Sequence, residues 1–176
     1  LTSIGVDLPD PNERAQYFPR FGLQGRQWNN QVSPMVQTRL VDLETREVVS
    51  DPGIQAELEI SGPSVFDGYW QAETTNREVF SEDGFFRTGD VFEIPTDPDK
   101  SDYYRFVGRS KDIIIRGGMK ISPDEIDNLL AAHPALTSAA VVGYEDPVLG
   151  ERIGVAAVPA TEAELTLDMI TGYLKE

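Results

Sequence analysis

Two adjacent glycines, Gly117 and Gly118, join two short apolar segments in "DIIIRGGMKI" and constrain the fold more than any other stretch. A glycine pair permits φ above zero, or close approach of a ligand or a second chain. It is also a common two-residue hairpin connector, and both interpretations can hold together. Helix-start signals follow: Ser122 can cap, Pro123 suits the first helical position, and Glu125 completes a capping box. The segment predicts a β-hairpin followed by a helix.

The chain after this hairpin predicts a small α+β domain. The segments "ALTSAAVVGY" and "ERIGVAAVPA" have nearly continuous apolar runs that predict strands, and "TLDMITGYLKE" begins a helix. The expected order is β-β-α-β-β-α over about 65 residues. Earlier residues favour a β-rich region, with alternating strands, one short helix from near Glu73, and irregular chain over 1–30. We expect a β subdomain at 1–108, a hinge at 109–112 and a C-terminal domain at 113–176.

The charge pattern points to a small anionic ligand. The net charge is -15 over 176 residues, which argues against binding of nucleic acid or an anionic membrane surface. Four cations nevertheless fall within twelve residues, where Asp112 is the only acid: Arg109, Lys111, Arg116 and Lys120. A phosphorylated ligand is their natural counterpart. The chain has no cysteine and no apolar run long enough to span a bilayer, so we expect a cytoplasmic protein.

Few residues suggest chemistry by themselves. Asp90, in "RTGD", could accept hydrogen bonds from adjacent sugar hydroxyls or merely bond its own turn. Lys111 and Asp112 form either a hinge or a solvated turn. The single histidine, His133, follows a predicted helix and is interpreted as a cap or surface residue. No cluster has metal-ligand spacing, so no metal site is predicted.

Several motifs together resemble one family. In order they are "GYW", "DGFFRTGD", "YRFVGRSKDIIIRGGMKISPDEID" and "HPALTSAAVVGYEDPVLGE". This series resembles the adenylate-forming superfamily of acyl-CoA synthetases, peptide-synthetase adenylation domains and beetle luciferases, from about residue 50 to residue 158. The resemblance implies that a carboxylate attacks the α-phosphate of ATP, and that coenzyme A then displaces AMP from the acyl-adenylate.

The resemblance also implies residue roles. Asp90 would hold the ribose hydroxyls, joined by Arg109, and Lys111 would be the pivot of a rotating C-terminal domain. Gly117 and Gly118 would line the tunnel for the thiol. Lys120 lies where some relatives carry an arginine near the phosphate. ATP or AMP, coenzyme A and Mg²⁺ are the implied cofactors, with the Mg²⁺ ligands expected outside this chain.

The family's upstream phosphate loop and its downstream lysine segment are absent from the sequence. We therefore expect a C-terminal piece of an acyl-CoA synthetase: the distal β subdomain of the AMP-binding region and a C-terminal domain truncated before the adenylating lysine. By itself the piece should be inactive. The alternatives are a ligase that performs only the thioester-forming half-reaction, and a non-catalytic binding module. The expected partners are a small carboxylate, ATP and coenzyme A, and the oligomeric state is left open.

Overall fold

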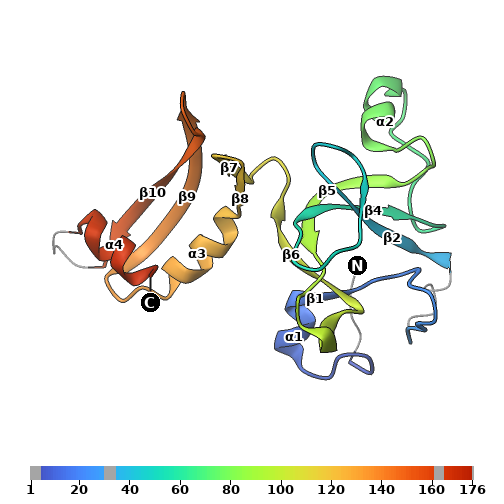
Figure 1. Ribbon diagram of the computed structural model, residues 1–176, viewed down its shortest axis with the longest axis horizontal. Coiled ribbons are helices and arrows are strands. Elements are labelled where there is room, and N and C mark those ends of the chain that lie inside the picture. The colour runs from blue at the N-terminus through green and yellow to red at the C-terminus, as the bar shows by residue number, and fades with distance from the viewer. Residues whose placement is uncertain (1–4, 30–34, 161–164, 176) are drawn as a thin grey trace. The chain divides into compact units, whose positions relative to one another are not determined.

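The computed structural model describes residues 5–29, 35–160 and 165–175. The chain divides into two compact units, Leu1–Ser110 and Lys111–Glu176 (Figure 1). This division lies inside the segment 109–112 for which the sequence predicts a hinge, and movement about that segment stays a prediction. Among the described residues, none of the helices has the length and apolar character needed to cross a membrane.

The first unit is built on a six-stranded antiparallel sheet in the order β1-β6-β5-β4-β2-β3. Its strands are β1 Tyr17–Pro19, β2 Gln37–Val41, β3 Val48–Val49, β4 Ala56–Ser61, β5 Phe86–Glu93 and β6 Tyr103–Arg109. Its helices are α1 Pro11–Gln16, α2 Glu73–Val79 and a short 3-10 helix, Pro98–Lys100. The predicted strands β2 to β6 and the helix from Glu73 are confirmed.

Two hydrophobic clusters hold the first unit together. One covers a face of the sheet and includes Leu40, Leu58 and Phe92. The other joins the opening segment to β6 through Trp28 and Tyr103, whose rings meet edge to face with centroids 5.1 Å apart. Burial of such aromatic side chains supplies much of the driving force for packing a segment that has little regular structure.

The prediction of irregular chain over residues 1–30 is wrong in part. Asp10 caps α1 by accepting a hydrogen bond from the Asn12 N–H at 2.8 Å. Strand β1 follows directly and pairs with β6, with Tyr17 opposite Arg105. A strand of three residues is too short to produce a detectable alternation, so its place in the sheet depends on a partner that is distant in sequence.

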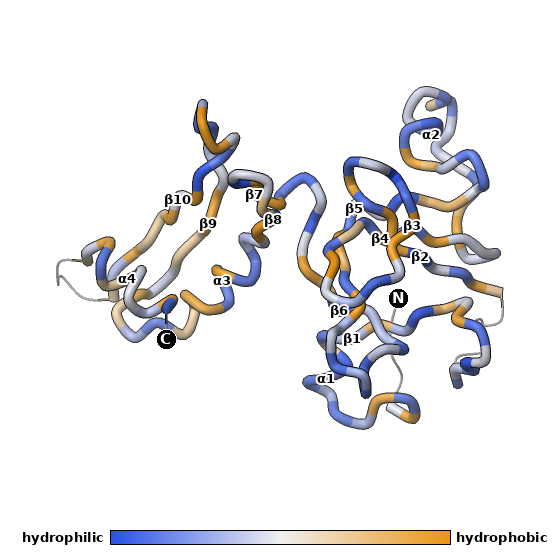
Figure 2. The backbone as a smooth tube through the Cα atoms, in the orientation of Figure 1, coloured by the Kyte–Doolittle hydropathy of each residue, from blue (hydrophilic) through white to orange (hydrophobic). Residues whose placement is uncertain are grey.

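The second unit has the predicted order β-β-α-β-β-α, which confirms the α+β class. Its elements are β7 Ile114–Arg116, β8 Met119–Ile121, α3 Pro123–Ala131, β9 Leu136–Asp146, β10 Gly150–Pro159 and α4 Leu167–Tyr173. The strands form a sheet in the order β8-β7-β10-β9. Figure 2 shows β9 and β10 largely in pale colours, which mark residues of intermediate hydropathy. Ser122 caps α3, with its Oγ accepting from the Glu125 N–H at 3.4 Å.

His133 was predicted to be a cap or a surface residue, and the structure excludes the surface position. Its side chain is buried, and its Nδ1 accepts a hydrogen bond from the Ala135 N–H at 3.1 Å. Its ring meets that of Tyr173 at a centroid distance of 4.6 Å. The residue therefore closes the turn after α3, as a cap would, but α4 covers it because the two helices lie over the same sheet (Figure 1).

Leu130 of α3 is fully buried at the centre of the second unit's core, together with Ile114, Val141 and Ile170. We expect Leu130→Ala to lower the free energy of unfolding of this unit by about 2 to 5 kcal/mol, because a cavity replaces the lost contacts. The neighbouring Leu129 is 54% exposed, so Leu129→Ala should change it by less than about 0.5 kcal/mol. Hydrogen exchange of β9 and β10 measures both, and equal effects would contradict this placement of the core.

Candidate functional site

A bulge in β5 determines the position of Asp90 in the sheet. On β4, Glu57 lies opposite Val91 and Glu59 lies opposite Arg87. One residue of β4 between these pairs therefore faces three residues of β5: Thr88, Gly89 and Asp90. Gly89 has φ of +70°, a conformation that glycine adopts without steric strain. Bulges of this kind redirect side chains and often lie next to binding sites.

Hydrogen bonds on both sides hold this bulge. The Thr88 hydroxyl donates to the Leu58 carbonyl at 2.8 Å and accepts from the Asp90 N–H at 3.1 Å. The Gly89 carbonyl accepts from the Ser110 N–H at 2.8 Å. The Gly89 N–H donates to the Glu57 carboxylate at 3.0 Å. Both backbone polar groups of Gly89 and the N–H of Asp90 thus have partners outside the regular sheet ladder, which helps to fix the bulge.

Asp90 and Arg109 meet on adjacent strands. They are register partners between β5 and β6, and Arg109 Nη1 lies 2.9 Å from Asp90 Oδ1. Burial raises the pKa of the Asp90 carboxyl, and Glu57 adds to that effect, whereas the Arg109 guanidinium lowers the pKa. Half of the Arg109 side chain is exposed. The pair can therefore offer carboxylate oxygens and guanidinium N–H groups to one ligand at the same time.

Asp90 also lines a cavity of about 340 Å³ on the core face of the sheet. The other lining residues are apolar or aromatic apart from Thr88: Phe18, Leu58, Ile60, Phe92 and Phe106. The Phe92 ring meets Phe18 and Phe106 edge to face, with centroids 5.4 and 5.3 Å apart. A carboxylate beside aromatic walls suits a ligand that carries hydroxyl groups next to a flat apolar group.

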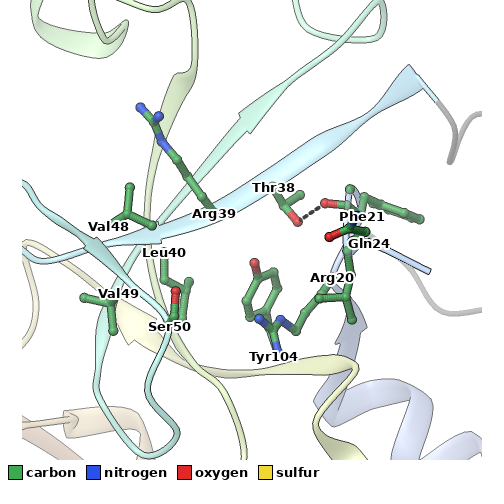
Figure 3. A pocket seen from close by; sticks show the side chains of 12 residues that line it. Arg20, Phe21, Gln24, Thr38, Arg39, Leu40, Val48, Val49, Ser50 and Tyr104 are labelled. Atoms are coloured by element: carbon green, nitrogen blue, oxygen red, sulfur yellow. Dashed lines mark hydrogen bonds between the residues drawn. The ribbon is translucent and has the colours of Figure 1, made fainter. Parts of the chain in front are cut away.

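A second cavity in this unit, of about 200 Å³, lies beside β2 and β3 and contains none of the predicted site residues. Figure 3 shows the Tyr104 ring in it, next to Arg20, whose guanidinium carbon lies 5.5 Å from the ring centroid. The Thr38 hydroxyl donates to the Phe21 carbonyl at 2.9 Å. The Arg39 side chain points away from Tyr104 in Figure 3, toward the carboxylates on the other face of the sheet.

In the second unit, Gly117 and Gly118 form the turn between β7 and β8, with φ of +59° and +82°. Positive φ at both positions is the hairpin geometry that favours glycine pairs. A Cβ built at Gly118 would meet nothing within 4 Å among the described residues, and one at Gly117 would lie 3.8 Å from Leu149. Backbone conformation rather than crowding therefore requires glycine here, and the space beside the turn is open.

Lys111 lies in an exposed turn, and Lys120 lies half-buried on β8 opposite Ile115. Lys111 also lines a cavity of about 340 Å³ within the second unit, together with Asp127 and Glu151. Those carboxylates are engaged: Asp127 accepts from the Val141 N–H at 2.8 Å, and Glu151 accepts from the Ile115 N–H at 2.6 Å. The described part of the chain holds no group of three metal-ligating side chains.

Glu57 is not among the residues predicted from the sequence, although its carboxylate contacts the bulge beside Asp90. The available signal is the alternation in "AELEIS", where two glutamates share one face of a strand whose other face is apolar. Two carboxylates on an otherwise buried strand indicate cationic partners on neighbouring strands.

Comparisons with known proteins identify relatives of both units. Residues 125–176 match the family model of the AMP-binding enzyme C-terminal domain. The chain is 41% identical over 162 residues to pyochelin synthase PchD of Pseudomonas aeruginosa, a match that covers 92% of this chain and 27% of that protein. It is 38% identical over 174 residues to the salicyl-AMP ligase / salicyl-S-ArCP synthetase of Mycobacterium tuberculosis, a match that covers 99% of this chain and 27% of that protein. It is 37% identical over 124 residues to a feruloyl-CoA synthase of an Amycolatopsis species, covering 70% and 24%.

The chain also matches solved structures. ATP-bound MatB from Rhodopseudomonas palustris matches with a TM-score of 0.68 and 31% identity, over 81% of this chain and 27% of that chain. The o-succinylbenzoate CoA synthetase MenE from Bacillus subtilis, in complex with its acyl-adenylate intermediate, matches with a TM-score of 0.66 and 26% identity, over 80% and 27%. The chain spans about a quarter of the length of the curated relatives it matches.

The raised pKa of Asp90 predicts a pH-dependent stability. Because the folded-state pKa lies above the unfolded value, the ionised carboxylate opposes folding at neutral pH. We expect Asp90→Asn to stabilise the first unit at neutral pH. The gain should shrink as the pH falls below the folded-state pKa of Asp90 and vanish below the unfolded-state pKa. Urea unfolding of both proteins from neutral pH down to about pH 4 measures this. A loss of stability in Asp90→Asn at neutral pH would show that the Arg109 pair outweighs burial.

Proposed function

The chain belongs to the adenylate-forming superfamily of ligases, and from this premise we propose that the protein carrying it is an acid–thiol ligase. In the first step a carboxylate attacks the α-phosphate of ATP and pyrophosphate leaves. In the second step a thiol attacks the carbonyl carbon of the acyl-adenylate and AMP leaves. Coenzyme A is the proposed thiol, and the feruloyl-CoA synthase and MenE relatives support it.

The observation that carries this proposal is the Asp90–Arg109 pair at an aromatic-walled cavity. Asp90 would accept hydrogen bonds from the two ribose hydroxyls, and the exposed half of Arg109 would donate to the same sugar. Charge-assisted hydrogen bonds of this kind contribute about 1.5 to 3 kcal/mol each. The apolar walls suit the adenosine portion of a nucleotide better than they suit a free sugar.

Other proposed roles belong to the second unit. The open turn at Gly117 and Gly118 would leave room for the pantetheine arm of the thiol, and Lys120 would place positive charge near a phosphate. Lys111 would be the pivot between the two steps. For Mg²⁺ the described residues do not fit, because they include no cluster of metal-ligating side chains. Its ligands are therefore expected in other parts of the protein.

A second candidate function differs in the acid that is activated and in the thiol that accepts the acyl group. The salicyl-AMP ligase / salicyl-S-ArCP synthetase matches almost the whole chain, and a 2,3-dihydroxybenzoate-AMP ligase of Bacillus subtilis matches 82% of it at 39% identity. These names favour an aromatic acid and a carrier-protein thiol. The two candidates share the adenylation step and differ in the thioester product.

We expect acid-dependent release of pyrophosphate when the whole protein is given ATP, Mg²⁺ and a panel of aromatic and aliphatic acids. Adding coenzyme A, or a carrier protein bearing pantetheine, should then raise AMP release, and the thiol that does so identifies the acceptor. Thioester formation only from a supplied acyl-adenylate would favour the half-reaction ligase. A protein that neither releases AMP nor uses any acyl-adenylate would contradict the proposal and favour a binding module.

Gly118→Leu tests the thiol path. A leucine side chain would fill the open space beside the turn, so we expect thioester formation from a supplied acyl-adenylate to fall by about tenfold or more, while pyrophosphate release changes by less than about twofold. Gly84→Leu is the matched control, because Gly84 has φ of +86° and equally open surroundings but lies in the first unit. It should carry the same backbone strain without the thioester defect. Equal effects of the two variants would assign the defect to strain alone.

A further inference from the structure

The face of the sheet opposite the hydrophobic core carries two buried carboxylates. Along β4, Leu58 and Ile60 turn to the core, whereas Glu57 and Glu59 turn to the other face. Glu57 is only 7% exposed, and Glu59 is only 1% exposed. Ionised groups so deeply buried are stable only when they are paired and hydrogen-bonded.

Arginines from two other segments pair with these carboxylates. Arg46 bridges both, with Nη1 2.6 Å from Glu57 Oε2 and Nη2 2.8 Å from Glu59 Oε1. Arg39 of β2 lies 2.7 Å from the second oxygen of Glu59 and continues to the exposed Asp83. A row of alternating charges thus runs across the sheet from Asp83 to Glu57.

The row ends at the bulge. Arg46 occupies Oε2 of Glu57, and Oε1 accepts the Gly89 N–H at 3.0 Å. Gly89 directly precedes Asp90, and its carbonyl is held from the other side by the Ser110 N–H. Because both its N–H and its carbonyl are engaged, Gly89 is held at the peptide that precedes it and at the peptide that leads into Asp90. Removing the Glu57 carboxylate would leave that N–H without its partner and the bulge free to relax.

Arg46 is itself held in place by a tight turn between β2 and β3. Its φ is +60°, which is unusual for a residue with a side chain. Asp42 Oδ1 accepts the N–H groups of Glu44 and Thr45 at 2.9 Å, and the Asp42 carbonyl accepts that of Arg46 at 3.2 Å. Arg46 therefore has a strained backbone, and its side chain reaches back to Glu57. Backbone strain of this kind persists where the surrounding structure imposes it.

We propose that Glu57 is a positioning residue for the nucleotide: together with Arg46, it fixes the Gly89 peptide and so directs the Asp90 carboxylate toward the ribose. This inference rests on the proposed function, because it assigns Asp90 to a nucleotide. Glu57 does not touch the ligand and acts through the backbone of the bulge. Its charge also faces Asp90 from β4, opposed by Arg109 from β6, and contributes to the raised pKa of Asp90.

The test uses the whole protein and compares variants in the KM for ATP. Glu57→Ala should raise this KM about tenfold, because the acceptor for the Gly89 N–H is lost. Glu57→Gln keeps an acceptor oxygen and should stay within about threefold of wild type. In an Asp90→Asn background, Glu57→Ala should add less than about twofold, since Glu57 acts only through Asp90.

Glu93→Ala is the matched control. Glu93 pairs with Arg105 at 3.0 Å, its side chain is 14% exposed, and it lies three residues further along β5. Loss of this ion pair should change the KM for ATP by less than about twofold. Hydrogen exchange of residues 86–92 gives a readout that is independent of catalysis: it should accelerate in Glu57→Ala and stay slow in Glu57→Gln.

Should Glu57→Ala fail to fold, Arg46→Ala takes its place, because it weakens the same anchor from a partly exposed position. It should raise the KM for ATP about threefold. An unchanged KM for ATP in Glu57→Ala, or in Arg46→Ala where that variant replaces it, would overturn the positioning role. So would a double variant whose KM rises by the product of the Glu57→Ala and Asp90→Asn effects. AMP binding without any acid-dependent turnover would overturn the proposed function alone, and the Kd for AMP then replaces KM. Absence of AMP binding by the wild type would overturn both.

Discussion

The strand arrangement of the first unit depends on two carboxylates that are buried on one strand. Glu57 and Glu59 lie buried on β4, and arginines converge on them from three segments: Arg39 from β2, Arg46 from the β2–β3 turn and Arg87 from β5. Each arginine must approach from a fixed direction, so the charges restrict the register of strands that hydrophobic contacts alone would hold less specifically.

The core of the second unit depends on apolar side chains instead. Its core consists of aliphatic side chains from β7, α3, β9 and α4, and the Ser122 cap starts α3 at a defined residue. Polar groups mainly serve the backbone there, as when Asp127 and Glu151 accept N–H groups of neighbouring strands. Buried charges thus add to hydrophobic packing in the unit that we propose to hold the nucleotide, whereas apolar side chains form the core of the unit that we propose to move.

Local patterns in the sequence predicted the elements whose signals are local. The hairpin at Gly117 and Gly118, the cap of α3 and the alternating strands β2 and β4 are of this kind. The strand β1 and the burial of His133 depend on contacts with Tyr103 to Arg105 and with Tyr173, which no short window contains. The proposed role of Asp90 was one of two interpretations of "RTGD", and the family resemblance favoured it. The Glu57 contact was missed because it depends on a bulge that appears only once the strands are paired.

The register between β1 and β6 also has a kinetic consequence. Tyr17 pairs with Arg105, so this ladder closes a loop that includes most of the first unit. The second unit, by contrast, is largely built from hairpins between sequence neighbours, such as β9 with β10. Loop closure over a long chain slows folding, and local contacts accelerate it. The second unit should therefore be able to form early and independently, while β1 completes its sheet only after the strands between it and β6 have assembled.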